Sequence, residues 1–151
     1  MPPLQKKNFQ AVNKLICNND PVFCHRERVA AADVNAGYTL LLATLNYKYR
    51  MVDLAMIAIG GAASGATDVR VSGTQAAAQV DLATVPVAGL TANTFLDLGN
   101  AGITVLTAGA SLAECDAGTP ITVRKTGGTL AGATSIDFVI FYQLIQTRQG
   151  A

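Results

Sequence analysis

Glycine marks the sharpest boundary in this sequence. None occurs in residues 1–36, whereas all fourteen lie in residues 37–151, singly or in pairs between short apolar runs. Within several of those runs apolar and polar side chains alternate, as in residues 68–72 and 121–124. A period of two is typical of half-buried β-strands, and glycine between strands indicates turns. The pattern therefore predicts a β-fold that begins at residue 37.

The alternation and the turn signals together place eight short strands. This number of strands with regular turns predicts an all-β fold, an eight-stranded antiparallel β-sandwich, and favours a jelly-roll-like order over an immunoglobulin-like one. The expected strands lie near residues 38–47, 51–60, 67–73, 79–87, 94–98, 103–107, 120–126 and 135–146.

Two of these strands are apolar on both faces. In residues 135–146, one face carries Ile136, Phe138 and Ile140, and the opposite face carries Val139 and Phe141. A sandwich strand with one wet face should not place large apolar residues on that face. Either the N-terminal segment or another subunit covers these second faces, and we favour a subunit contact. The predicted oligomer interface comprises Met51, Ile57, Val139 and Phe141.

Charge is scarce, which also favours assembly. Charged residues make up 14% of the chain, against about 25% in typical soluble domains. A monomer needs surface charge to stay soluble and apart from its neighbours. We therefore expect a homo-oligomer, a trimer, that hides part of its surface.

The first 36 residues form a basic N-terminal arm, distinct from a β-sandwich domain at residues 37–151. Five basic and three acidic residues give the arm a net charge of +2. Apolar residues spaced by three and four predict a short amphipathic helix that ends before Pro21. This helix packs either on its own domain or on a neighbouring subunit or partner. The residues expected to contact a partner are Lys6, Lys7, Phe9, Lys14, Arg26 and Arg28.

The sequence lacks a recognisable catalytic or metal-binding pattern. The one histidine, His25, follows Cys24 directly, and adjacent side chains point apart in an extended chain. The cysteines lack the close spacing of a zinc site, and the glycine-rich stretches lack the ending of a phosphate loop. We therefore expect no enzyme activity, no cofactor and no metal.

We expect neither nucleic acid nor a membrane to be a binding partner of this chain. Aromatic and basic residues interleave in residues 47–50, but a wet turn between strands uses the same residues. The most apolar stretch, residues 51–63, is shorter than a membrane-spanning helix and contains Asp53. Without a secretory signal, and with three cysteines in no framework pattern, the chain is expected to fold in a cytoplasm.

Taken as a whole, the pattern across residues 38–146 resembles the small decoration, or cement, proteins on the heads of tailed bacteriophages. The run from Arg50 to Asp68, with its Gly60-Gly61 and Gly65, contributes most to the resemblance. It implies a virion protein on the capsid surface, assembled in the host cytoplasm as a trimer that binds the major capsid protein, with the arm contacting the shell. The alternatives are a phage coat protein and a head-fibre or receptor-binding module.

Overall fold

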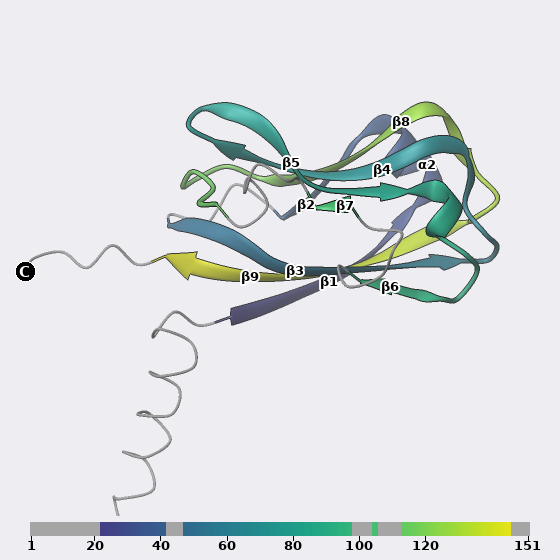
Figure 1. Ribbon diagram of the computed structural model, residues 1–151, viewed down its shortest axis with the longest axis horizontal. Coiled ribbons are helices and arrows are strands. Elements are labelled where there is room, and N and C mark those ends of the chain that lie inside the picture. The colour runs from purple at the N-terminus through teal and green to yellow at the C-terminus, as the bar shows by residue number, and fades with distance from the viewer. Residues whose placement is uncertain (1–21, 42–46, 98–103, 106–112, 146–151) are drawn as a thin grey trace, which may run out of the picture.

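A computed structural model describes residues 22–41, 47–97, 104–105 and 113–145. In these residues two antiparallel sheets stack face to face (Figure 1). Sheet A has the order β1-β9-β3-β6, and sheet B has the order β2-β8-β4-β5-β7. The strands are β1 (Val22–Ala30), β2 (Tyr38–Leu41), β3 (Lys48–Ile59), β4 (Ser64–Gln75), β5 (Ala78–Pro86), β6 (Phe95–Asp97), β7 (Thr104–Val105), β8 (Ile121–Ala131) and β9 (Ser135–Ile145). Two short helices, α2 (Ala31–Ala36) and η1 (Val87–Gly89), connect the sheets.

The strand pairs are nested along the chain. β1 pairs with β9, β2 with β8, β3 with β6, and β4 with β5, all antiparallel. The chain is thus one long antiparallel ribbon that wraps over itself, which is the arrangement of an eight-stranded jelly roll. The two-residue β7 adds to the edge of sheet B. The predicted all-β sandwich is confirmed, with the jelly-roll order that the sequence favoured.

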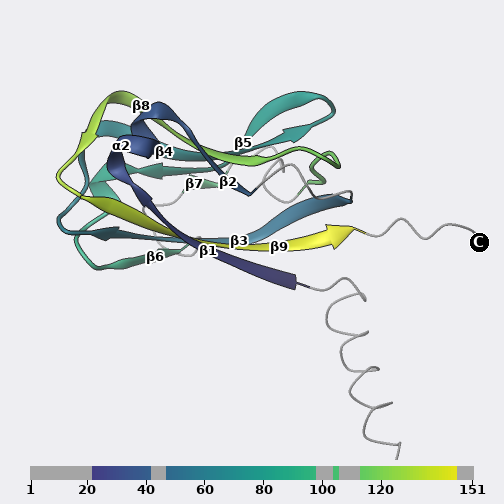
Figure 2. The ribbon, with the colours of Figure 1, turned by 180° about the vertical axis from the view of Figure 1, so that it is seen from behind.

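Each of the eight expected strands is present, but the sandwich begins earlier than residue 37. β1 and α2 lie in the segment that the glycine boundary assigned to the arm. β1 pairs with β9 along its whole length, from Val22 opposite Gln143 to Ala30 opposite Ser135. Figure 2 shows β1 along the edge of the sheet, ahead of α2. The strand lacked an apolar signal because most of its side chains are exposed or half-buried, and only Val29 is buried.

The core lies between the two sheets. Its largest fully buried side chains include Tyr49, Phe138, Met51, Leu54 and Met56. The hydroxyl group of Tyr49 donates to the backbone oxygen of Thr119 at 3.2 Å, and burial raises the pKa of this phenol to about 12. Because Tyr49 is a core residue, the aromatic and basic run at residues 47–50 is not a continuous stacking surface.

Two crossings between the sheets meet at one end of the molecule. The β3–β4 and β8–β9 connections lie side by side there (Figure 1), and the amide of Thr134 donates to the oxygen of Ile59 at 2.9 Å. Gly132 has a φ of +78°, and a Cβ atom on it would lie 2.2 Å from the oxygen of Ala62. Only glycine fits this close approach without a shift of the backbone.

Candidate functional site

The outer face of sheet A carries the residues that the sequence placed at an interface. β9 alternates as expected: Ile136, Phe138 and Ile140 are fully buried, whereas Val139 and Phe141 are half-buried on the opposite face. Directly opposite residues in an antiparallel pair share a face. Val139 is opposite Ala55 of β3, and Phe141 is opposite Asp53. The second face of β9 is therefore the outer face of sheet A.

Large apolar side chains extend across this face to the β6 edge. Ile57 is half-buried and lies between Asp137 of β9 and Phe95 of β6 in the strand register. Phe95 is 52% exposed, and among the described residues the other exposed large hydrophobic side chains are Val22, Phe23 and Tyr47. We refer to Ile57, Phe95, Val139 and Phe141 as the apolar patch. Contiguous apolar surface of this kind marks interaction sites more often than isolated apolar residues do.

Met51 does not belong to this patch. Its side chain is 1% exposed and lies in the core. The cause is a β-bulge: Met51 is opposite Tyr142 and Asp53 is opposite Phe141, so β3 has one extra residue, Val52, at this point. Because of the bulge, Met51 and Leu54 both point into the core, although side chains three residues apart in a regular strand point to opposite faces. A uniform period of two could not predict this arrangement, and Met51 is a core residue instead of the interface residue that we expected.

A charged cluster borders the patch on its β1 side. Arg28 donates to both carboxylate oxygens of Asp137, with Nε–Oδ1 2.5 Å and Nη2–Oδ2 2.9 Å, and Arg26 Nη2 lies 3.1 Å from Oδ2. Asp137 is only 2% exposed, whereas the side chains of Arg26 and Arg28 are 65% and 58% exposed. We call these three residues the Asp137 cluster. The hydrogen bonds from Arg28 lower the pKa of Asp137 against the opposing effect of burial.

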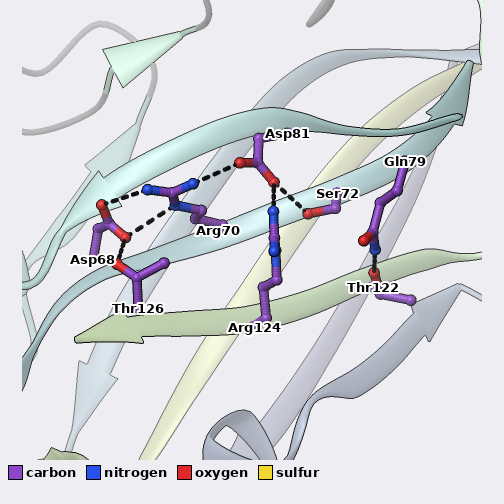
Figure 3. Close-up of polar contacts among 8 residues, drawn as sticks. All are labelled: Asp68, Arg70, Ser72, Gln79, Asp81, Thr122, Arg124 and Thr126. Carbon is purple, nitrogen blue, oxygen red and sulfur yellow. Dashed lines mark hydrogen bonds and ion pairs between the residues drawn. The ribbon is translucent and has the colours of Figure 1, made fainter. Parts of the chain in front are cut away.

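The outer face of sheet B has a different character. Arg70 bridges Asp68 and Asp81, and Arg124 Nη2 lies 2.6 Å from Asp81 (Figure 3). The hydroxyl group of Ser72 also donates to Asp81 at 2.7 Å. We call Asp68, Arg70, Asp81 and Arg124 the Asp81 network. Burial alone would raise the pKa values of both aspartates, but the hydrogen bonds from their partners outweigh it and lower both values.

The Asp81 network and the Asp137 cluster therefore differ in charge balance. The Asp81 network joins two carboxylates to two guanidinium groups, so its formal charges cancel. The Asp137 cluster joins two guanidinium groups to one carboxylate, which leaves a formal charge of +1 beside apolar side chains. The outer face of sheet A thus combines partly exposed apolar side chains with exposed arginines, a residue type enriched at protein interfaces.

The expected arm residues fall into two groups. Lys6, Lys7, Phe9 and Lys14 lie outside the described residues. Arg26 and Arg28 lie on β1, where they belong to sheet A and contact Asp137. The sequence did not identify Asp137 as a candidate site residue. The signal that could have identified it is a carboxylate in a strand that is otherwise apolar on both faces.

The residues considered for chemistry are engaged in ordinary contacts. The Nε2 atom of His25 lies 3.1 Å from Glu27, which also accepts a hydrogen bond from the hydroxyl group of Tyr38. Cys24 is exposed and Cys115 is buried, and both are free thiols. Among the described residues, there is no group of three or more His, Cys, Asp or Glu side chains that could hold a metal ion. No helix in the described part of the chain is long and apolar enough to cross a membrane.

The described fold is similar to that of a chain in a solved structure, whereas comparisons by sequence find no match. No protein-family model matches the chain, and a comparison with curated proteins finds no match in sequence. A chain of the solved structure described as the acidic stable capsid structure of Helicobacter pylori bacteriophage KHP30 aligns with a TM-score of 0.40 and 14% sequence identity. The alignment covers 83% of this chain and 89% of that chain. Agreement at this level leaves function to be argued from the molecule's own surfaces.

Proposed function

We propose that this chain is a structural protein of a phage head, which binds the capsid from outside as a decoration or cement protein. The observation that carries the proposal is the unequal pair of outer faces on a jelly-roll sandwich. The Asp81 network on sheet B pairs its charges within itself, whereas sheet A displays apolar side chains beside two exposed arginines that share one carboxylate, Asp137. Jelly rolls are among the folds that viral capsid proteins use, although a fold alone does not define a function.

The sheet A side is the proposed assembly side. Of the residues expected at the oligomer interface, Phe141 would contribute to contacts between copies in a homo-oligomer, a trimer. Ile57 and Val139 border the Asp137 cluster and would face the capsid protein. Arg26 and Arg28, together with Lys6, Lys7, Phe9 and Lys14 of the arm, would contact the major capsid protein. No catalysis, cofactor, nucleic acid or membrane has a part in this function. The protein would be assembled on the virion in the host cytoplasm.

A coat protein is the principal alternative, because shells themselves are also built from jelly rolls. A head-fibre or receptor-binding module is the other, but the chain has no Trp for the aromatic platforms that carbohydrate sites commonly use. The coat and decoration roles differ in one consequence. A shell survives the loss of its decoration protein and does not survive the loss of its coat protein.

Electron microscopy of the source particle tests the proposal. Particles assembled with and without this protein are imaged, and its position is identified by antibody labelling. We expect density on the outer surface of intact heads, lost without collapse of the shell when the protein is omitted. Collapse on omission would establish a coat role, and absence from purified particles would contradict a virion role altogether.

A further inference from the structure

The Asp137 cluster has more positive charge than its own structure requires. A single guanidinium group is enough to neutralise one buried carboxylate, and Arg28 already makes a two-point contact with Asp137. Arg26 adds a second cation through only one hydrogen bond. On sheet B, by contrast, each added arginine is matched by an added aspartate. The surplus is therefore a feature of the Asp137 cluster alone, since Asp53 and Asp97 carry negative charge elsewhere on the same face.

Both arginines retain N–H donors that Asp137 does not use. A guanidinium group carries five N–H donors, of which Arg28 uses two on Asp137 and Arg26 uses one. Both side chains are more than half exposed, while Asp137 beneath them is 2% exposed. The buried carboxylate thus orients two exposed guanidinium groups before any partner arrives. Such preorganisation reduces the side-chain entropy lost on binding.

The surroundings of the cluster add a second requirement on the partner. Arg26 is opposite Val139 in the β1–β9 register, and Asp137 is opposite Ile57 in the β9–β3 register. The guanidinium pair therefore borders the apolar patch directly. A partner group that satisfies the arginines places its neighbouring side chains over Ile57 and Val139.

We propose that the Asp137 cluster and the adjoining part of the apolar patch, Ile57 and Val139, form one docking site for a protein segment that presents an Asp or Glu carboxylate flanked by large apolar side chains. The carboxylate accepts hydrogen bonds from Arg26 and Arg28, and the apolar side chains cover Ile57 and Val139. Arginine is one of the residue types that commonly dominate binding at protein interfaces, and burial of the apolar side chains adds to it. This inference rests on the proposed function only for the identity of the partner, which would be the capsid shell.

The site is tested with a defined peptide, independently of any shell. The probe is acetyl-Leu-Glu-Phe-Asp-Leu-amide, and its control replaces the two acids by Gln and Asn. We expect the acidic peptide to shift the side-chain Nε–H resonances of Arg26 and Arg28 and the amides of Ile57 and Val139 saturably. The control peptide should not shift them. Equal shifts with both peptides, or none with either, would overturn the proposal.

Variants separate this site from the rest of the surface. Arg26→Gln leaves the two-point contact of Arg28 with Asp137 in place, so the fold is retained. It should weaken peptide binding at least about five-fold. The matched control, Arg124→Gln on sheet B, should bind as the wild type does. Wild-type binding by Arg26→Gln, or equal weakening by both variants, would contradict the assignment.

Binding to shells stripped of this protein then tests the partner. If wild type binds shells and Arg26→Gln binds at least about five-fold more weakly, the docking site is the one used on the capsid. If the peptide binds and the shells do not, the proposed function fails while the docking site stands. If the shells bind wild type and Arg26→Gln equally, the docking site is wrong for this partner while the proposed function stands.

Discussion

Asp137 combines near-complete burial with a full charge, and its neighbours explain how both are tolerated. A buried carboxylate without partners is costly, so it must be paired and hydrogen-bonded. The hydrogen bonds from Arg28 are the largest influence on Asp137 and lower its pKa, and those from Arg26 act in the same direction. Arg28 shows the reciprocal effect, with a pKa raised by the same contact. The pair therefore stabilises the folded state whenever Asp137 is ionised.

Asp137→Asn should destabilise the sandwich by roughly 1–3 kcal/mol at pH 7, because the charge-assisted hydrogen bonds from both arginines are lost. The pKa of Asp137 is lower in the folded state than in the unfolded state, where it is about 4. The ionised carboxylate therefore stabilises the fold above that pH, and this stabilisation is lost as the pH falls from about 4 through the lower pKa of the folded state. Urea unfolding followed by circular dichroism at pH 7 and pH 3 measures both effects. A difference between variant and wild type that is equally large at pH 3 would show that the ion pair is not its source.

At the scale of elements, β1 shows what the sequence could not reveal. Its nine residues pair fully with β9, yet their side chains include His25, Arg26, Glu27 and Arg28, which carry no apolar alternation. An edge strand has only one neighbour, and charged side chains are common there because they discourage pairing with other chains. The remaining strands alternate clearly or are flanked by glycine, and each overlaps the range that the sequence predicted. β4 (Ser64–Gln75) and β8 (Ile121–Ala131) extend beyond their predicted ranges, and residues 42–46 of the first predicted strand lie outside the described residues. The bulge in β3, which buries Met51, was likewise invisible to a strict period of two.

Truncation at two points should separate the arm from the sandwich. Deleting residues 1–21 should leave the unfolding midpoint nearly unchanged, because no described strand is lost. Deleting residues 1–30, which the glycine boundary suggested would be harmless, should now prevent stable folding. That deletion removes β1, exposes the edge of β9 and removes the buried Val29, whose burial alone contributes roughly 1.5–3 kcal/mol. Circular dichroism and thermal unfolding of both truncated proteins test this prediction. A cooperative unfolding transition in the protein that lacks residues 1–30 would support a domain boundary at residue 37.

The crossing between β8 and β9 gives a second test at this scale. Gly132→Ala should cost roughly 2 kcal/mol or more, because the left-handed conformation and the contact with Ala62 both disfavour a Cβ atom. Gly37→Ala is the control, since Gly37 also has a positive φ but its Cβ atom would lie 4.0 Å from the nearest atom, the oxygen of Val123. Gly37→Ala should therefore show the conformational cost alone. Equal unfolding free energies for the two variants would mean that the crossing adjusts to the added methyl group.

At the scale of the whole molecule, the two sheets bury one core but face their surroundings differently. The inner face of β9 contributes Ile136, Phe138 and Ile140 to that core, as the sequence predicted. The outer face of the same strand carries Val139 and Phe141 without a covering layer among the described residues. The sequence was enough to predict these two faces, since both follow from alternation along one strand. It could not predict the bordering Asp137 cluster, which depends on a strand distant in the chain.

Adjacent substitutions in β9 distinguish folding from assembly. Ile140 is fully buried between the sheets, so Ile140→Asp places an unpaired charge in the core and should unfold the subunit. Phe141 is half-buried on the outer face beside Asp53, where an aspartate stays solvated in a free subunit. Phe141→Asp should therefore keep the circular dichroism spectrum of the wild type while it weakens the proposed oligomer by several kcal/mol, because the contact would bury that charge. Sedimentation velocity at micromolar concentration measures the oligomer. A Phe141→Asp protein that remains as associated as the wild type would show that this face stays in contact with water, and the assembly surface would then have to lie elsewhere on the molecule.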